Sequence, residues 1–404
     1  MKKEREYPRA VIDKRAERSV KAGHPWVYDN AIKSCDEASN GALVDVISEG
    51  GSYLGTGFIS TNSKIRIRIL TNNANETFTP AFWERRVKYA LAYRKSVMGE
   101  EDYKCCRLIH GESDGFPGLT VDRYNDLLST EVLSFGTESV KEIIYQALID
   151  ELANDGVTIR GIYERNENKI RELEGLPLYK GWWKDTDSSP IATIIENGIT
   201  YDVDVENGQK TGFFLDQKYN RLAVAKLARG KNVLDCFTHT GSFAMNAAMG
   251  GANHVTAVDV SQVAVDMAHH NAEVNGLSDR MDFICDDVFD LLPRLTAEKR
   301  VYDFIILDPP AFTKSRKTTD NAKRGYKEIN YRAMKLLPRG GYLATCSCSH
   351  FMPNELFKKM LGEAARDAGV TLKLIEERRA GPDHPVAMSI PETDYLKFYL
   401  LQIV

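Results

Sequence analysis

The sequence contains few cysteines and no long apolar run. Its seven cysteines are an odd number spread over 404 residues, which does not suit a disulfide framework, and no Cys/His set has zinc-site spacing. No window approaches the roughly 18 apolar residues of a membrane span, and the charged N-terminus lacks the apolar core of a signal peptide. We therefore expect no structural metal, no membrane association and a cytoplasmic location.

The chain also lacks a large excess of charge of either sign. It has 53 Lys and Arg residues against 57 Asp and Glu residues, which argues against a whole-surface nucleic-acid coat but allows a local basic patch. Basic residues outnumber acidic ones in the first 75 residues. The clearest basic stretch there, Arg9–Lys21, is consistent either with an RNA-contacting surface or with an ordinary solvated face.

Three successive patterns of expected strands and helices predict three domains. Residues 1–75 hold short β-rich runs between turn signals and predict a small β-rich module. Residues 76–190 mix amphipathic helices with short strands, which predicts an α+β middle domain without a catalytic constellation. In residues 191–404 strands alternate with helices. A length of 404 residues suits this number of domains.

The C-terminal region predicts a doubly wound α/β fold. Its continuous apolar segments, separated by helical stretches, indicate a parallel sheet covered on both faces. The five expected strands are 232–237, 254–260, 280–287, 302–308 and 341–349. A strand over 371–379 and an antiparallel partner over 395–404 complete a mostly parallel, seven-stranded, Rossmann-like domain. That ending is typical of class I methyltransferases.

The loop in Val233–Phe243 is poor in glycine, and this decides between cofactors. A dinucleotide fold needs G-x-G-x-x-G here so that the backbone can approach a pyrophosphate, but this loop has only Gly241. Asp235 would repel a diphosphate and favour the ammonium and sulfonium of S-adenosylmethionine. We therefore expect S-adenosylmethionine beside Asp235, Phe237, Thr238 and Gly241. The structural alternative is a plain strand-to-helix turn.

Two further strand ends carry acids suited to a nucleoside. Asp259 lies 18 residues after Gly241, where a doubly wound fold places the acid that binds ribose hydroxyls. Alternatively, it only helps to start the helix after Ser261. Asp287 is preferred over its neighbour Asp286 for the adenine amino group.

The fourth and fifth strand ends carry the residues that point to a reaction. Asp308 follows an apolar run and begins Asp308–Phe312, an Asp-Pro-Pro segment typical of methyl transfer to a base or an amide nitrogen, with Ala311 interposed before the aromatic residue. Cys346 and Cys348 lie at the end of the next strand. Methylation of a nitrogen needs no thiol.

Methylation of carbon 5 of a pyrimidine does need one, because that carbon becomes nucleophilic only after a thiolate has added at carbon 6. Asp308 would then hydrogen-bond or protonate N3 as charge develops there. The sequence does not identify the base that removes the carbon-5 proton. The structural alternative is that both cysteines are buried packing residues, which are common in strands.

A basic segment follows directly. Lys314–Lys327 has six Lys and Arg residues against one Asp, which suits contacts with phosphates, and Phe312 and Tyr326 are expected to stack on bases. A solvated loop is the alternative. The predicted substrate-binding residues are Phe312, Lys314, Arg316 and Lys317.

Taken together, these motifs resemble the bacterial 23S ribosomal RNA cytosine-5 methyltransferases that carry an N-terminal PUA domain, a family within the class I S-adenosylmethionine enzymes. The resemblance covers the whole chain. Its most specific parts are Asn207–Arg221, the loop in Val233–Phe243, Asp308–Phe312, Ser347–Ser349, Asp383–Pro385 and Tyr395–Lys397.

The resemblance implies roles for the domains and for further residues. Residues 1–75 look like a PUA module, an RNA-binding fold, and the segment from Phe213 to Arg221 would flank the cofactor. The nucleophile of the family is a cysteine followed by serine; Cys346 and Cys348 both fit, and the spacing to the downstream Phe-Met pair favours Cys348. The wider cytosine-5 pattern has a second cysteine at the position of Ala311, so product release must use another group.

The implied function is S-adenosylmethionine-dependent transfer of a methyl group to carbon 5 of a cytosine in ribosomal RNA, with 23S ribosomal RNA as the partner. Two alternatives stay open: an N-methyltransferase acting on nucleic acid or protein, and a non-catalytic RNA-binding assembly factor. The modified nucleotide, the choice between naked RNA and a ribosomal particle, and the formation of a homodimer are left open by the sequence.

Overall fold

The computed structural model describes residues 5–313 and 319–404 and divides into two compact units. The first unit comprises residues 1–194, 203–215 and 382–393, and the second comprises 195–202, 216–381 and 394–404. The chain therefore passes between the units several times. The finer division into three domains at residues 75 and 190 stays a proposal.

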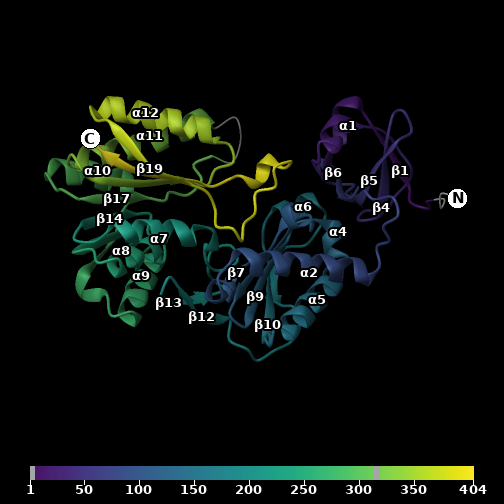
Figure 1. The fold of residues 1–404 in the computed structure, drawn as a ribbon, viewed down its shortest axis with the longest axis horizontal. Coiled ribbons are helices and arrows are strands. Elements are labelled where there is room, and N and C mark those ends of the chain that lie inside the picture. Colours follow the sequence, from purple (N-terminus) through teal and green to yellow (C-terminus); the bar gives the residue numbers. More distant parts are fainter. Residues whose placement is uncertain (1–4, 314–318) are drawn as a thin grey trace. The chain divides into compact units, whose positions relative to one another are not determined.

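The N-terminal part of the first unit is a six-stranded sheet in the order β2-β6-β5-β4-β1-β3 (Figure 1). Its strands are β1 (Arg9–Ile12), β2 (Trp26–Tyr28), β3 (Ile32–Cys35), β4 (Leu43–Ser48), β5 (Tyr53–Ile59) and β6 (Ile65–Thr71). A Cβ atom at Gly57 on β5 would lie 2.1 Å from the carbonyl oxygen of Arg68 on β6, so only glycine allows these strands to pack. The sheet confirms the β-rich prediction for this region.

The basic stretch of this region folds into a helix, α1 (Lys14–Lys21), which the sequence analysis did not predict. The side chain of Asp13 caps it by accepting a hydrogen bond from the backbone N–H of Ala16 at 2.7 Å. None of these eight described residues is buried. The helix therefore presents its charged side chains to solvent.

The rest of the first unit contains a five-stranded sheet in the order β11-β10-β9-β8-β7. Its strands are β7 (Cys105–His110), β8 (Leu119–Tyr124), β9 (Leu127–Val132), β10 (Gly161–Asn166) and β11 (Tyr179–Trp182). The accompanying helices are α2 (Pro80–Val97), α3 (Glu100–Tyr103), α4 (Phe135–Glu138), α5 (Lys141–Asn154) and α6 (Ile170–Leu173). Strands packed with helices are the α+β pattern expected of this region.

A two-stranded hairpin begins and ends in the first unit, and its tip, residues 195–202, belongs to the second. It consists of β12 (Ile191–Glu196) and β13 (Ile199–Asp204). The turn residues Asn197 and Gly198 have φ angles of 54° and 78°, the left-handed conformation that an Asn-Gly turn adopts readily.

The second unit is built on a seven-stranded sheet in the order β16-β15-β14-β17-β18-β20-β19. Its strands are β14 (Asn232–Cys236), β15 (His254–Asp259), β16 (Met281–Cys285), β17 (Phe304–Leu307), β18 (Tyr342–Ser347), β19 (Leu372–Arg378) and β20 (Lys397–Ile403). The five strands from β14 to β18 run parallel, whereas β20 is antiparallel to both β18 and β19. This topology confirms the predicted fold class.

Helices connect these strands, as the alternation of patterns predicted. They are α7 (Lys218–Leu227), α8 (Ser242–Met249), α9 (Gln262–Val274), α10 (Val288–Ala297), α11 (Thr319–Leu336) and α12 (Asn354–Ala368). Only α7 was not predicted. Among the described residues, no helix has the length and apolar character needed to cross a membrane.

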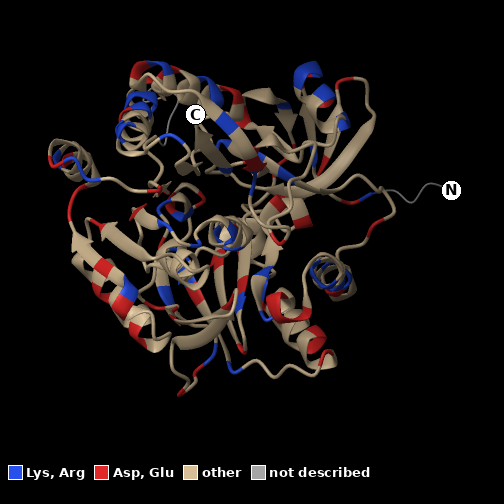
Figure 2. Ribbon diagram, turned by 60° about the vertical axis from the view of Figure 1, so that its left-hand side comes forward, with Lys and Arg blue, Asp and Glu red and all other residues tan. Residues whose placement is uncertain are grey.

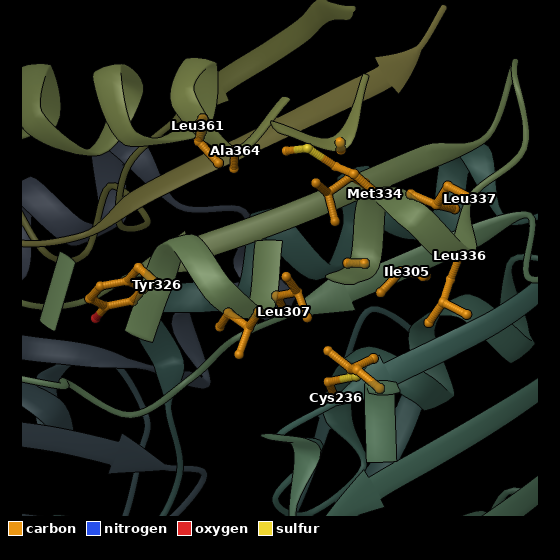
Figure 3. Close-up of a cluster of buried hydrophobic side chains, with 14 of the residues drawn as sticks. Cys236, Ile305, Leu307, Tyr326, Met334, Leu336, Leu337, Leu361 and Ala364 are labelled. Atoms are coloured by element: carbon orange, nitrogen blue, oxygen red, sulfur yellow. The ribbon is translucent and has the colours of Figure 1, made fainter. Parts of the chain in front are cut away.

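One apolar core lies between the sheet and helices α10, α11 and α12 (Figure 3). Ile305 and Leu307 alternate along β17 and point into this core, where they lie near Tyr326 and Met334 of α11. Every residue of β17 is fully buried, which explains why the strand reads as a continuous apolar run. The core therefore fixes the sheet edge from which the polar residues project.

Candidate active site

Polar side chains gather where the parallel strands of the second unit end. Asp235 lies near the end of β14, Asp259 ends β15, and Asp308 follows β17. Asp287 follows β16, and Cys348 follows β18. Because all five strands point the same way, the sheet brings these residues to one edge, where doubly wound folds bind their ligands.

The loop after β14 has a strained backbone. Phe237, His239 and Gly241 have φ angles of 64°, 50° and 79°. A left-handed conformation is costly for a bulky residue such as Phe237, and such strain is concentrated at ligand-binding sites. A Cβ atom at Gly241 would lie 2.9 Å from the Cβ of Ala268 on α9. The single glycine of the loop is therefore required by both its φ angle and its packing.

The buried side chain of Asp235 holds this loop through hydrogen bonds. Its Oδ2 accepts hydrogen bonds from Thr238 Oγ1 at 2.6 Å and from the backbone N–H of Ala244 at 2.9 Å. Complete burial raises the pKa of Asp235 to about 7, and the nearby charge of Asp308 also raises it, although the hydrogen bonds from Thr238 and Ala244 act in the opposite direction. The carboxyl group is thus poised to respond to a nearby cation.

The second oxygen of Asp235 provides a test of the cofactor. Its Oδ1 is buried and has no hydrogen-bond partner among the described residues. An unpaired buried carboxylate oxygen is unfavourable, and a positive charge nearby would offset that cost, whereas a diphosphate would increase it. The donor set therefore fits the sulfonium and ammonium groups of S-adenosylmethionine.

Asp259 is tied to the same loop. Its Oδ2 accepts a hydrogen bond from the backbone N–H of His239 at 2.9 Å, and its Oδ1 accepts one from Ser261 at 3.0 Å. The carboxylate thus holds the cofactor loop and also helps to start α9. Its predicted contact with ribose hydroxyls would use the remaining lone pairs and stays a prediction.

Asp287 and Asp286 differ in their surroundings. Asp287 is exposed and caps α10, with Oδ1 accepting a hydrogen bond from the backbone N–H of Phe289 at 2.8 Å. Asp286 is half-buried and pairs with Arg294. The cap uses one oxygen of Asp287, and its predicted contact with adenine stays a prediction.

Two buried side chains, those of Gln217 and Cys346, interact with Asp308. Its Oδ1 accepts a hydrogen bond from Gln217 Nε2 at 3.1 Å, and its carboxyl group also interacts with the thiol of Cys346. Desolvation raises the pKa of Asp308 to about 6, and the charge of Asp216 adds to this effect. Because the side chain remains partly accessible, it can both face a ligand and hold a proton near neutral pH.

The two candidate cysteines have opposite environments. Cys346 is completely buried, and burial together with the nearby carboxylate of Asp308 raises the pKa of its thiol. Cys348 is partly exposed. Since a thiolate is the reactive species, burial disfavours Cys346 as a nucleophile and leaves Cys348 accessible.

The two aromatic residues predicted to stack on bases, Phe312 and Tyr326, also differ in burial. Tyr326 is completely buried in the core beside α12, so its ring is not accessible to a base in this conformation. Phe312 is half-buried, with its ring centroid 4.6 Å from that of Tyr326 and 5.8 Å from that of Phe289. The predicted phosphate-binding residues Lys314, Arg316 and Lys317 lie outside the described residues.

The two residues expected to flank the cofactor belong to different compact units. Phe213 belongs to the first unit, where its backbone N–H donates to the hydroxyl of Tyr124 at 3.0 Å. Arg221 belongs to the second unit, on α7, and its Nη1 donates to Glu196 Oε1 at 2.6 Å in a buried ion pair. A direct contact of either residue with the cofactor stays a prediction.

Gln217 and Lys397 have no individual role predicted from the sequence, although both lie in segments that carry the family resemblance. Lys397 is only 5% exposed, and its Nζ donates to the carbonyl oxygens of Ser349 and Tyr395 at 2.6 Å each. A lysine at the start of the mostly apolar strand β20 was the signal in the sequence. Of its two partners, Ser349 lies 48 positions away in the chain, whereas Tyr395 is two residues away.

The seven-stranded topology and the acidic cofactor loop together define an S-adenosylmethionine-dependent methyltransferase. A family model described as an S-adenosylmethionine-dependent methyltransferase matches residues 177–398, and a PUA-like domain model matches residues 11–72. The Ribosomal RNA large subunit methyltransferase I of Klebsiella pneumoniae subsp. pneumoniae is 38% identical over 400 residues, which cover 98% of this chain and 99% of the relative. The protein of the same name from Yersinia pseudotuberculosis serotype O:1b is 38% identical over 398 residues, with the same coverage.

This chain therefore belongs to the S-adenosylmethionine-dependent methyltransferase family that includes these relatives. The fold is shared with solved structures. A protein from Streptococcus mutans described as S-adenosylmethionine-dependent superposes with a TM-score of 0.83 at 22% identity, over 98% of this chain and 99% of that one. A methyltransferase structure complexed with S-adenosylhomocysteine superposes with a TM-score of 0.84 at 22% identity, over the same shares of the two chains.

Proposed function

We propose that this protein transfers a methyl group from S-adenosylmethionine to carbon 5 of a cytosine in 23S ribosomal RNA. The name of the relatives supports ribosomal RNA of the large subunit as the substrate. The PUA-like domain supports RNA as the partner. The choice of carbon 5 depends on the residues at the ends of β17 and β18.

One observation carries the proposal: Cys348 is a partly exposed thiol at the sheet edge that also holds Asp308. Burial raises the pKa of the Tyr326 hydroxyl, and the charges of Cys348 and Asp308 raise it further, which supports a position of both groups near this side chain. A methyltransferase acting on nitrogen has no use for such a thiol, whereas carbon-5 methylation requires one.

In the proposed reaction the Cys348 thiolate forms a bond to carbon 6 of the cytosine. The electron pair of the ring's 5,6 double bond then serves carbon 5 as the nucleophile. When bound, S-adenosylmethionine supplies an electrophilic methyl group and leaves as S-adenosylhomocysteine. A base takes the proton from carbon 5, the double bond re-forms, and the bond between carbon 6 and Cys348 breaks with the electron pair returning to sulfur.

Asp308 would interact with N3 of the base during addition. Negative charge develops on N3 when the thiolate attacks carbon 6, and a protonated carboxyl group can stabilise it by donating a hydrogen bond. The raised pKa of Asp308, about 6, keeps a fraction of this group protonated near neutral pH. Gln217 orients the carboxyl group through its hydrogen bond to Oδ1.

The test is to replace each cysteine separately by serine and to map 5-methylcytosine in 23S ribosomal RNA from cells that carry each variant. Cys348→Ser should abolish the modification, by at least about a thousandfold in vitro, because the nucleophile is lost. Cys346→Ser is the matched control and should retain activity within about tenfold, since Cys346 is buried.

Normal methylation by Cys348→Ser would reject the carbon-5 mechanism and favour an N-methyltransferase. Calorimetric titration of S-adenosylmethionine into both variants shows whether the cofactor site is intact. Absence of cofactor binding by the unaltered protein would instead favour a non-catalytic RNA-binding factor.

A further inference from the structure

Lys397 is a buried lysine at the sheet edge of the active site. It lies on β20 opposite Ser347 of β18, and its side chain reaches the segment that follows β18. Its Nζ donates to two carbonyl oxygens, those of Ser349 and Tyr395. Because carbonyl oxygens carry no full negative charge, these contacts solvate the ammonium only in part.

The charged and titratable groups that act on Lys397 and Cys348 come from several elements. The charges of Cys348 and Asp394 both raise the pKa of Lys397. The charge of Cys348 in turn raises the pKa of Tyr326 of α11 and that of Cys346 of β18. The carboxyl group of Asp308 acts on the same two residues, so an anionic Cys348 would have negative charge nearby.

Lys397 supplies a positive charge that acts on this thiol from β20. Burial lowers the pKa of Lys397 to about 8, and the charge of Cys348 raises it. The two groups therefore favour each other's charged forms. Geometry agrees with this coupling, because Lys397 bonds to the carbonyl oxygen of Ser349, the residue next to Cys348.

We propose that the Lys397 ammonium is a positioning residue that stabilises Cys348 as the reactive thiolate. The thiol proton leaves to solvent, its electron pair stays on sulfur, and Lys397 keeps its own proton in this step. The same ammonium holds the backbone of Ser349 and so fixes the direction of the thiolate. The inference deepens the proposed function, because a thiolate at this position is what addition to carbon 6 requires.

The test is the pH dependence of Cys348 alkylation in the full-length protein. Iodoacetamide labels the protein between pH 5 and 10, and mass spectrometry of the Cys348 peptide separates it from the exposed Cys35 and Cys285. The midpoint of the rate profile gives the thiol pKa without requiring RNA or cofactor. The midpoint is compared rather than a single rate, because a thiolate of higher pKa is also a better nucleophile.

Three variants separate charge from structure. Lys397→Gln keeps a hydrogen-bond donor for the Ser349 carbonyl but removes the charge. Lys397→Arg keeps the charge. Lys373→Gln is the matched control, because Lys373 is an exposed lysine on β19 of the same sheet.

We expect Lys397→Gln to raise the midpoint by about one pH unit or more. Lys397→Arg should restore most of the shift, and Lys373→Gln should leave the midpoint where it is in the unaltered protein. An unchanged midpoint in Lys397→Gln would overturn the inference. So would equal shifts in Lys397→Gln and Lys397→Arg, since these would show a packing effect. If Lys397→Gln fails to fold, Lys397→Arg alone decides, and a midpoint raised by a unit despite retained charge would count against the proposal.

This experiment can fail independently of the proposed function. Loss of methylation in Cys348→Ser together with an unshifted midpoint in Lys397→Gln would keep the nucleophile and reject the role of Lys397. A shifted midpoint together with full methylation by Cys348→Ser would keep the electrostatic effect of Lys397 on Cys348 and reject Cys348 as the nucleophile.

Discussion

At the scale of single residues, the two aspartates of the cofactor edge are unusual because burial raises rather than lowers their affinity for protons. The pKa of Asp235 is raised to about 7 and that of Asp308 to about 6. A carboxyl group whose pKa is raised in the folded state contributes stability below its unfolded value, and this contribution is lost as pH rises through the folded value. Ligands that carry positive charge reverse this, because they favour the ionised form.

The first prediction concerns cofactor affinity. S-adenosylmethionine should bind about twentyfold more tightly at pH 8 than at pH 6. About tenfold of this arises because binding a cation beside Asp235 requires the carboxylate, which is largely protonated at pH 6 in the free protein, and about twofold comes from Asp308. Asp235→Asn should weaken binding and reduce the pH dependence to about twofold, the part expected from Asp308. Isothermal titration calorimetry at the two pH values measures both effects.

Asp259→Asn is the comparison variant, because it removes a charge from the end of β15 that is hydrogen-bonded to the same loop. It should retain most of the pH dependence. A tenfold dependence that persists in Asp235→Asn would assign the titration to another group.

At the scale of elements, the loop between β14 and α8 depends on one glycine. Gly241→Ala should destabilise the protein, by roughly 1–2 kcal/mol for the left-handed conformation and by about 1–3 kcal/mol for the collision with Ala268 of α9. Gly230→Ala is the matched control, because Gly230 has a similar φ of 72° but open space around a Cβ. Thermal unfolding of the two variants should show the larger loss for Gly241→Ala, together with loss of cofactor binding. Equal losses would mean that packing against α9 contributes nothing.

A buried ion pair connects β12 to α7. Glu196 and Arg221 are both almost completely buried, and their charged groups meet at 2.6 Å. Glu196→Ala should cost about 3–5 kcal/mol of unfolding free energy, since it removes the carboxylate that pairs with the buried guanidinium of Arg221.

The double variant Glu196→Ala/Arg221→Ala distinguishes this reason from lost packing. If the unpaired charge is the cause, the double variant should be more stable in urea unfolding than the sum of the single losses predicts. Additive losses would point to packing instead.

At the scale of the whole molecule, acidic and basic residues are interspersed on the helices, as the near-balanced composition requires (Figure 2). Affinity for RNA must then come from local groups rather than from the total charge. Helix α1 is the clearest such group in the N-terminal module, since Lys14, Arg15, Arg18 and Lys21 are all exposed.

We predict that Lys14→Gln/Arg15→Gln weakens RNA binding without changing cofactor affinity. Each lost phosphate contact should reduce the slope of log affinity against log salt concentration by about 0.7–0.9. Filter binding of a ribosomal RNA fragment over a range of salt concentrations measures the slope. The same pair of changes at Lys335 and Arg339, in the second unit, serves as the control. An unaltered slope in the α1 variant would remove this helix from the RNA interface.

The sequence by itself determined most of the order of strands and helices in the second unit, because buried parallel strands such as β17 are mainly apolar and most of their polar residues lie near their ends. For the same reason it placed Asp235, Asp308 and the cysteines at one edge. It did not predict α1, whose apolar face consists only of Ala16 and Val20, or α7, which buries polar residues such as Lys218 and Asn220.

Only the tertiary structure decided which of these residues are accessible and what charges surround them. Cys346 and Cys348 are two residues apart on one strand end, yet one is buried beside Asp308 and the other is partly exposed. Tyr326 turned inward to the core instead of facing a base. Arg221 pairs with Glu196, which is 25 positions away in the chain. Lys397 contacts Ser349, which is 48 positions away. Burial and electrostatic coupling arise from such distant contacts, and local sequence patterns do not encode them.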